Sequence, residues 1–274
     1  MMTLPSVYAV GYNSANSSSY VLKQTEGIGD FYQISDQGTA VFLQGVCVTR
    51  ENDVYIARRG DDIYKLVGGA GEFIPLGLTL RDWYHLAAAP NGDIYATAVP
   101  GGLFKQTGGS GAFNAFTTPP ATNPALHAVT VAINGDIYAA HWSGKVWKLP
   151  GGLGTTWEAQ TDGEGGWYAL AAAPNGDIYA TAVAGDIYKQ TGGAGAFNAL
   201  GQTHRWWQGL CVTQQGDVYA TVGEMGTVGI YKMPIGSSTF SKLTLGLAAG
   251  FHFFGVATRL DNPGFRRSYA TIIG

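Results

Sequence analysis

The stretches NGDIYATAVPGGLFKQTGGSGAF (91–113) and NGDIYATAVAGDIYKQTGGAGAF (175–197) decide the fold, because they are two copies of one unit. Looser copies begin at Asp53, Asp136 and Asp217, and a degenerate copy begins near Ser6. Each copy carries a lysine after its second aromatic-rich strand: Lys23, Lys65, Lys105, Lys148, Lys189 and Lys232. A period of 40–43 residues is that of a β-propeller blade with four short strands.

Residues 83–116 illustrate how one copy forms a blade. Its first segment is apolar enough for a strand buried on both faces, and Asn91-Gly92 then favours a tight hairpin turn. The four strands are expected at 83–90, 93–99, 103–107 and 112–116. The sequence therefore predicts an all-β fold, a six-bladed β-propeller of four-stranded antiparallel blades.

The two ends of the chain are expected to share one blade. Residues 6–34 supply a second, a third and a fourth strand, so that blade has no first strand. FHFFGVATR (251–259) matches the first-strand segments of other copies, such as LQGVCVTR (43–50). We therefore predict one domain over residues 1–274, closed when the C-terminal strand joins the N-terminal blade. The last segment, RRSYATIIG (266–274), has no place in this count.

Composition and charge argue against several classes of protein. Charged residues are 13% of the chain and the net charge is −3, which gives no reason to expect a nucleic-acid partner. No stretch approaches the roughly 18 apolar residues of a membrane helix, so membrane insertion is not expected. The N-terminus MMTLPSVYAV lacks the pattern of a signal peptide. An extracellular or virion-associated location stays open.

Positions that repeat in every copy are predicted to be structural. The recurrent tyrosines, such as Tyr95 and Tyr179, suit the layers between blades. The aspartates two residues before them are interpreted as turn residues that bond local backbone. Cys47 and Cys211 share a small, buried column in blades that are not neighbours, so no disulfide is expected.

Residues that vary between copies are the candidates for binding. They lie in the loops before the first strands and in the turns between second and third strands, which share one face of a propeller. Aromatic rings beside Asp, Arg and His are typical of sugar sites, where a ring stacks on C–H groups and polar groups bond hydroxyls. The candidate ligand-binding residues are Asp82, Trp83, Tyr84, His141, Trp142, Trp167, Tyr168, His204, Arg205, Trp206 and Trp207.

A packing role competes with binding for part of this set. Trp83, Trp167 and Trp207 share a column that Leu43, Leu126 and Phe253 fill in other copies. A column of large apolar residues favours the blade interface or core. The remaining candidates lie outside the repeated pattern, and binding and packing stay open for them.

Signatures of catalysis are few. The chain has no H-E-x-x-H, no Cys-x-x-Cys, no G-x-S-x-G and no phosphate loop, and its five histidines lack metal-ligand spacing. We expect no cofactor and no bound metal, and a protein that is not an enzyme. Catalysis at the channel mouth remains an alternative, ranked after the two hypotheses given below.

An aromatic before the first strand, then NG-D-[IV]-Y-A, [IV]-Y-K and a glycine-rich turn, resembles the tachylectin-2 and tectonin group of β-propeller lectins. The resemblance implies multivalent binding of N-acetylated sugars between blades, near Trp83-Tyr84, Trp167-Tyr168 and Trp206-Trp207. The first hypothesis is therefore a lectin for surface glycans, such as a receptor-binding component of a viral particle. The second is a structural or protein-docking propeller that receives a protein partner on one loop face.

Overall fold

The computed structural model describes residues 5–120, 125–161, 165–183, 185–223, 228–245 and 251–259. In these residues the regular elements are β-strands and short 3-10 turns, so the predicted all-β class is confirmed. The segment 266–274 lies outside the described residues. No helix among the residues described has the length and apolar character needed to span a membrane.

The strands form antiparallel sheets that follow the repeats. Among the described residues, four sheets have four strands each. Their strands are β24 (Phe251–Thr258), β1 (Val7–Asn13), β2 (Ser18–Gln24) and β3 (Tyr32–Thr39); β12 (Leu126–Val131), β13 (Ile137–His141), β14 (Val146–Leu149) and β15 (Glu158–Ala159); β16 (Trp167–Ala172), β17 (Ile178–Ala182), β18 (Ile187–Gln190) and β19 (Asn198–Ala199); β20 (Trp207–Val212), β21 (Val218–Val222), β22 (Gly229–Met233) and β23 (Ser241–Lys242).

A fifth sheet has eight strands, which the repeat pattern does not predict. It joins β4 (Leu43–Val48), β5 (Val54–Asp61), β6 (Ile63–Leu66), β7 (Ile74–Pro75), β8 (Arg81–Ala88), β9 (Ile94–Val99), β10 (Gly102–Gln106) and β11 (Asn114–Ala115). The join arises because β5 runs past its hairpin and pairs with the start of β8, Arg59 opposite Asp82 and Asp61 opposite Arg81.

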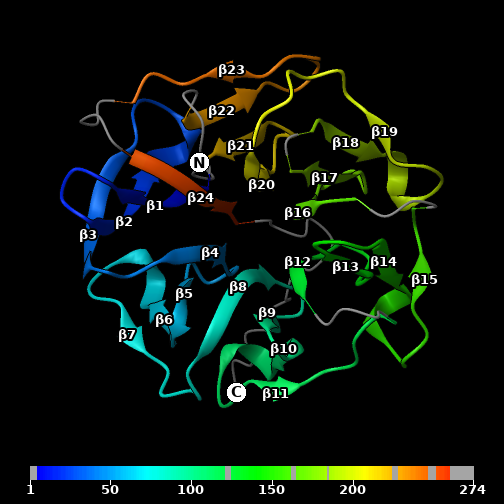
Figure 1. The fold of residues 1–274 in the computed structure, drawn as a ribbon, viewed down its shortest axis with the longest axis horizontal. Coiled ribbons are helices and arrows are strands. Elements are labelled where there is room, and N and C mark those ends of the chain that lie inside the picture. Colours follow the sequence, from blue (N-terminus) through cyan, green and yellow to red (C-terminus); the bar gives the residue numbers. More distant parts are fainter. Residues whose placement is uncertain are drawn as a thin grey trace, which may run out of the picture.

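The sheets are arranged around a central axis in chain order (Figure 1). Their innermost strands contact one another in the cyclic order β24, β4, β8, β12, β16, β20 and back to β24. These strands surround a cavity of about 90 Å³. Several four-stranded antiparallel sheets around such an axis form a β-propeller.

The ring closes where β24 meets β1, as the sequence predicted. The two strands are antiparallel, with Val7 opposite Thr258 and Val10 opposite Gly255. The Thr258 hydroxyl also donates to the Ser6 carbonyl at 3.0 Å. Figure 1 shows β24 lying beside β1, so the two ends of the chain are held in one sheet.

Apolar side chains fill the layers between neighbouring sheets. In one layer Tyr55 and Ile63 of the β5–β6 hairpin pack with Trp83 and Ile94, and all four side chains are almost fully buried. Tyr138 and Tyr219 are likewise buried, as expected for an inter-blade tyrosine column. Cys47 and Cys211 are buried and are not joined in a disulfide, as predicted.

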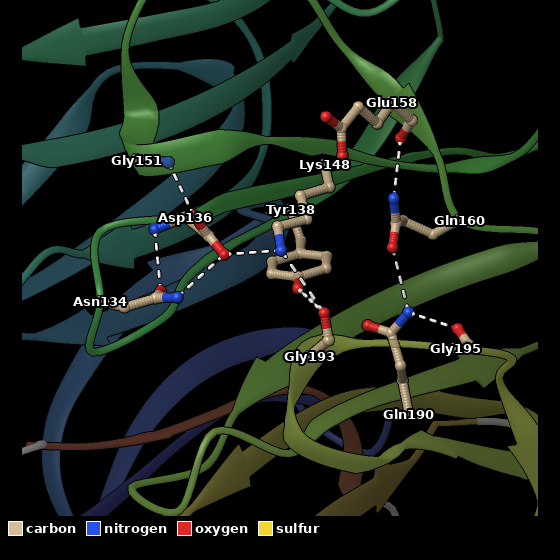
Figure 2. Close-up of polar contacts among 10 residues, drawn as sticks. All are labelled: Asn134, Asp136, Tyr138, Lys148, Gly151, Glu158, Gln160, Gln190, Gly193 and Gly195. Atoms are coloured by element: carbon tan, nitrogen blue, oxygen red, sulfur yellow. Dashed lines mark hydrogen bonds and ion pairs between the residues drawn. The ribbon is translucent and has the colours of Figure 1, made fainter.

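The repeated aspartates do more than the predicted turn contact. Asp136 Oδ1 accepts the Gly151 N–H at 2.6 Å, fifteen residues further on, and its Oδ2 pairs with Lys148 Nζ at 2.8 Å (Figure 2). Asn134 Nδ2 donates to the same Oδ2 at 2.9 Å. The corresponding ion pairs are Asp53–Lys65, Asp93–Lys105, Asp177–Lys189 and Asp217–Lys232. The lysine therefore recurs in each of these repeats because it pairs with the aspartate of the same repeat.

The tyrosines after three of these aspartates bond the next repeat. Tyr138 OH donates to the Gly193 carbonyl at 3.1 Å, in the 3-10 turn η5 (Thr191–Gly193) (Figure 2). Tyr55 OH does the same to Gly109 at 2.9 Å, and Tyr219 OH donates to Gln24 Oε1 at 3.0 Å. The other 3-10 turns are η1 (Thr25–Gly27), η2 (Val67–Gly69), η3 (Thr107–Gly109) and η4 (Pro150–Gly152).

The outermost strands differ from the prediction in length. The expected strand over 112–116 is reduced to Asn114–Ala115, because Phe113 and Phe116 turn into separate apolar layers. β7, β15, β19 and β23 are equally short, whereas β3 has eight residues that are mostly exposed.

Candidate functional site

Four aromatic and imidazole rings meet near the start of three innermost strands, β8, β12 and β16. The ring centres of Tyr84 and His127 are 4.4 Å apart, and those of His127 and Trp142 are 5.0 Å apart. Tyr168 lies 5.8 Å from His127 and 5.6 Å from Trp142. All four side chains are half-buried. We call Tyr84, His127, Trp142 and Tyr168 the mouth cluster.

The sheets position these rings in a simple way. Tyr84, His127 and Tyr168 directly follow the buried first-strand column of Trp83, Leu126 and Trp167, so three successive innermost strands present them at the same level. Trp142 follows β13, and its backbone N–H donates to the Ala125 carbonyl at 3.2 Å. The Thr97 hydroxyl donates to the His127 carbonyl at 3.2 Å and fixes that backbone.

Gln44 reaches the mouth cluster from the far side of the ring. Tyr168 OH donates to Gln44 Oε1 at 3.3 Å. These residues belong to β16 and β4, which lie on opposite sides of the axis (Figure 1). The hydrogen bond therefore crosses the central axis beside the rings of the mouth cluster.

A charged pair borders the mouth cluster next to Tyr84. The pairing of β5 with β8 sets Arg59 beside Asp82, with Nε 3.5 Å from Oδ2. The Arg59 guanidinium also lies 5.8 Å from the centre of the Tyr84 ring. The side chains of Arg59 and Asp82 are 50% and 36% exposed, so both are available to a ligand.

The histidines at this site are neutral at neutral pH. Burial lowers the pKa of His127 to about 4, and the charges of His85, Arg59 and His141 act in the same direction. Burial also lowers the pKa of His85 to about 4, although its Nδ1 contact with the Val129 carbonyl at 3.2 Å opposes this. A neutral imidazole can offer one N–H donor and one acceptor, which suits hydroxyl recognition.

The predicted site residues separate into two groups, of which the first is buried. Trp83 and Trp207 are 1% exposed and Trp167 is 7% exposed. Trp83 packs edge-on against Phe104 at 5.2 Å. Rings this deeply buried have no face for a ligand, so the packing interpretation holds for all three. The prediction that these three tryptophans stack on a ligand is therefore corrected. His141 is only 4% exposed and belongs to the same buried group.

The second group stays near the surface. The structure brings together Tyr84, Trp142 and Tyr168, and sets Asp82 at their edge. His204 is exposed and Trp206 is half-buried, in the loop before β20. The backbone of Arg205 pairs with Gly185, and its guanidinium lies over Tyr231 at 5.1 Å. Arg205 thus takes part in packing.

Sequence reasoning missed His127, Gln44 and Arg59 as members of the site. His127 and Gln44 occupy the same repeat position as Tyr84 and Tyr168, one residue after the column of large apolar residues. That position varies between copies, which was the available signal. Arg59 enters through the unexpected pairing of β5 with β8.

The described residues contain no group of three or more His, Cys, Asp or Glu side chains that could hold a metal ion. The mouth cluster offers ring faces and an imidazole, with the Gln44 amide beside Tyr168 and with one guanidinium and one carboxylate at its edge. This inventory fits binding through stacking and hydrogen bonds.

Comparison with known proteins gives the fold. No protein-family model matches the chain, and no curated protein matches it. Among solved structures, a protein of unknown function from Bacteroides caccae is 10% identical with a TM-score of 0.63, over 93% of this chain and 98% of that one. Virginiamycin B lyase from Staphylococcus aureus is 13% identical with a TM-score of 0.56, over 77% of each chain. YCF48 bound to D1 peptide is 14% identical with a TM-score of 0.54, over 74% and 68%.

These similarities support the β-propeller fold and nothing finer, because identities this low carry no function. The similar structures include an enzyme, so the fold is compatible with catalysis. None of the three is a tachylectin or a tectonin.

Proposed function

We propose that this chain is a non-enzymatic carbohydrate-binding propeller whose site is the mouth cluster. The observation that carries the proposal is the meeting of Tyr84, Trp142 and Tyr168 around His127, at centre distances of 4.4–5.8 Å. Half-buried rings stack on the C–H faces of a sugar, and the neutral imidazole and Gln44 offer hydrogen bonds to its hydroxyls.

The proposal includes six blades and a lectin-like repeat. We count six by dividing the eight-stranded sheet into β4–β7 and β8–β11, each of which has the strand order of a repeat. Unlike the inter-blade sites that the tectonin-like repeat implies, the mouth cluster occurs once among the residues that the structure describes. We therefore propose one principal site per chain, so avidity for surface glycans would need several copies of the chain.

A binding experiment tests the site. Wild type, Trp142→Ala and Trp206→Ala are applied to a glycan array, and sugars that bind are titrated by calorimetry. Trp206→Ala is the matched control, since it removes a half-buried tryptophan from another loop. We expect Trp142→Ala to weaken binding by about tenfold or more, and Trp206→Ala to keep it. Wild type that binds no sugar on the array would refute the proposal.

A protein-docking role is the second candidate, and β3 favours it. This strand forms the edge of its sheet and is eight residues long, whereas the other outermost strands described have two. Exposed edge strands can accept an added strand from a partner. Gln33→Lys would place a charge at an exposed position of β3 and oppose such pairing without touching the mouth cluster. Co-purification of a stable partner that this substitution releases would favour docking over glycan binding.

A further inference from the structure

The charged border of the mouth cluster indicates which class of sugar fits it. In the described part of the chain, the Arg59 guanidinium donates a hydrogen bond only through Nε, to Asp82 Oδ2 at 3.5 Å. Its two terminal Nη groups take no protein partner among those residues, and half of the side chain is exposed. The two Nη groups of this guanidinium can therefore donate a pair of parallel hydrogen bonds to a ligand.

The position of this edge matters more than its exposure. The guanidinium carbon lies 5.8 Å from the centre of the Tyr84 ring, and Tyr84 is in turn 4.4 Å from His127. The positive charge of Arg59 is among those that oppose protonation of His127, after burial and His85. Arg59 therefore acts at the mouth cluster itself and does not project away from it.

Two neighbouring guanidinium groups are directed elsewhere. Arg58 pairs with Asp61 at 3.2 Å, donates to Gln37 Oε1 at 2.6 Å and covers the Tyr64 ring at 3.7 Å. Arg81 lies over the Phe104 ring at 4.7 Å. Among the residues that the structure describes, Arg59 is thus the guanidinium placed to meet a ligand that lies on Tyr84. Paired N–H groups of arginine match the two oxygens of a carboxylate, and this charge-assisted geometry is stronger than a neutral hydrogen bond.

We propose that the ligand is an acidic sugar, one that carries a carboxylate beside its ring. The sugar ring lies on the mouth cluster, and its carboxylate accepts two hydrogen bonds from the Nη groups of Arg59. The Asp82 carboxylate still accepts the hydrogen bond from Arg59 Nε, and this contact orients the two Nη groups toward the mouth cluster. This inference rests on the proposed function and narrows its ligand class.

Two probes that differ only in the carboxylate test the inference. Methyl β-D-glucuronide and methyl β-D-glucoside are titrated by calorimetry into wild type, Arg59→Gln and Arg205→Gln. Arg205→Gln is the matched control, because it removes a guanidinium that also lies over aromatic rings but contacts Trp207 and Tyr231 instead. Thermal unfolding of each variant is recorded alongside.

We expect wild type to bind the glucuronide about tenfold more tightly than the glucoside. Arg59→Gln should reduce that preference to less than about twofold, while Arg205→Gln should retain it. Equal binding of the two probes by wild type would overturn the inference and leave the proposed function standing. Binding of neither probe, by a protein that binds neutral glycans on the array, would also overturn it. A preference unaffected by Arg59→Gln would remove Arg59 from the assignment.

Discussion

At the scale of single residues, the most repeated interaction is the ion pair between an aspartate and the lysine of its repeat. Lys148 is 19% exposed and Asp136 is 10% exposed, so the pair is partly shielded from water. Burial works to raise the pKa of Asp136, but the Gly151 N–H, Lys148 and Asn134 together lower it below its ordinary value. The folded state therefore favours the charged carboxylate.

Lys148→Met should destabilise the fold by about 1–3 kcal/mol, because it leaves a shielded carboxylate without its cation. Lys23→Met is the matched control. Lys23 holds the same repeat position, but Ser6 stands where the other repeats have the aspartate. No acidic partner of Lys23 is found among the described residues. We expect this control to change stability by less than about 0.5 kcal/mol. Urea unfolding of both variants at pH 7 measures the difference.

The same comparison has a predictable pH dependence. Since the pKa of Asp136 is lower in the folded state, its contribution is complete above the unfolded value of about 4 and is lost as the pH falls through the folded value. The gap in stability between wild type and Lys148→Met should therefore shrink below about pH 4. A gap that stays constant down to pH 2 would contradict the ion-pair explanation.

At the scale of strands and sheets, tyrosine hydroxyls link neighbouring sheets. Tyr138→Phe removes the hydrogen bond to Gly193 and should cost about 0.5–1.5 kcal/mol. Tyr179 occupies the same column, and its hydroxyl, like that of Tyr138, contacts the lysine of its own repeat. Among the described residues no hydrogen bond from Tyr179 to the next sheet is found, so Tyr179→Phe should be nearly neutral. Thermal unfolding of the two variants distinguishes the bond from the loss of a phenol. Equal losses would assign the effect to general packing.

Most strands and their pairing within a repeat could be predicted from the sequence, because hairpin turns and the spacing of the lysines depend on residues close together in the chain. The strands of residues 83–106 and the joining of 251–259 to the N-terminal sheet follow from such patterns. The pairing of β5 with β8 could not be predicted, since it depends on how two hairpins meet in space. For the same reason Tyr84, Trp142 and Tyr168 were predicted only as separate candidates, and the variable repeat position of His127 did not show that its ring contacts all three.

At the scale of the whole molecule, stability depends on closing the ring with β24. This strand pairs with β1 along its length and contacts the innermost strands on both sides, β4 and β20. Its Val256 and Phe253 are 4% and 1% exposed, so they belong to the apolar layers. Without β24, β1 would present an unpaired edge and two layers would open to water.

A pair of truncations tests this dependence. A chain that stops after Gly250 lacks β24, and we expect it to lose more than about 4 kcal/mol, the range of losses that follow from opening a core. For a protein of this size such a loss lowers the unfolding midpoint by about 10 °C or more. A chain that stops after Arg259 keeps β24 and is the control, with a midpoint within about 2 °C of wild type. Differential scanning calorimetry of the three chains gives both values. If the two truncated chains melted together and below wild type, residues 260–274 and not β24 would be the segment on which stability depends. If all three chains melted together, stability would depend on neither segment.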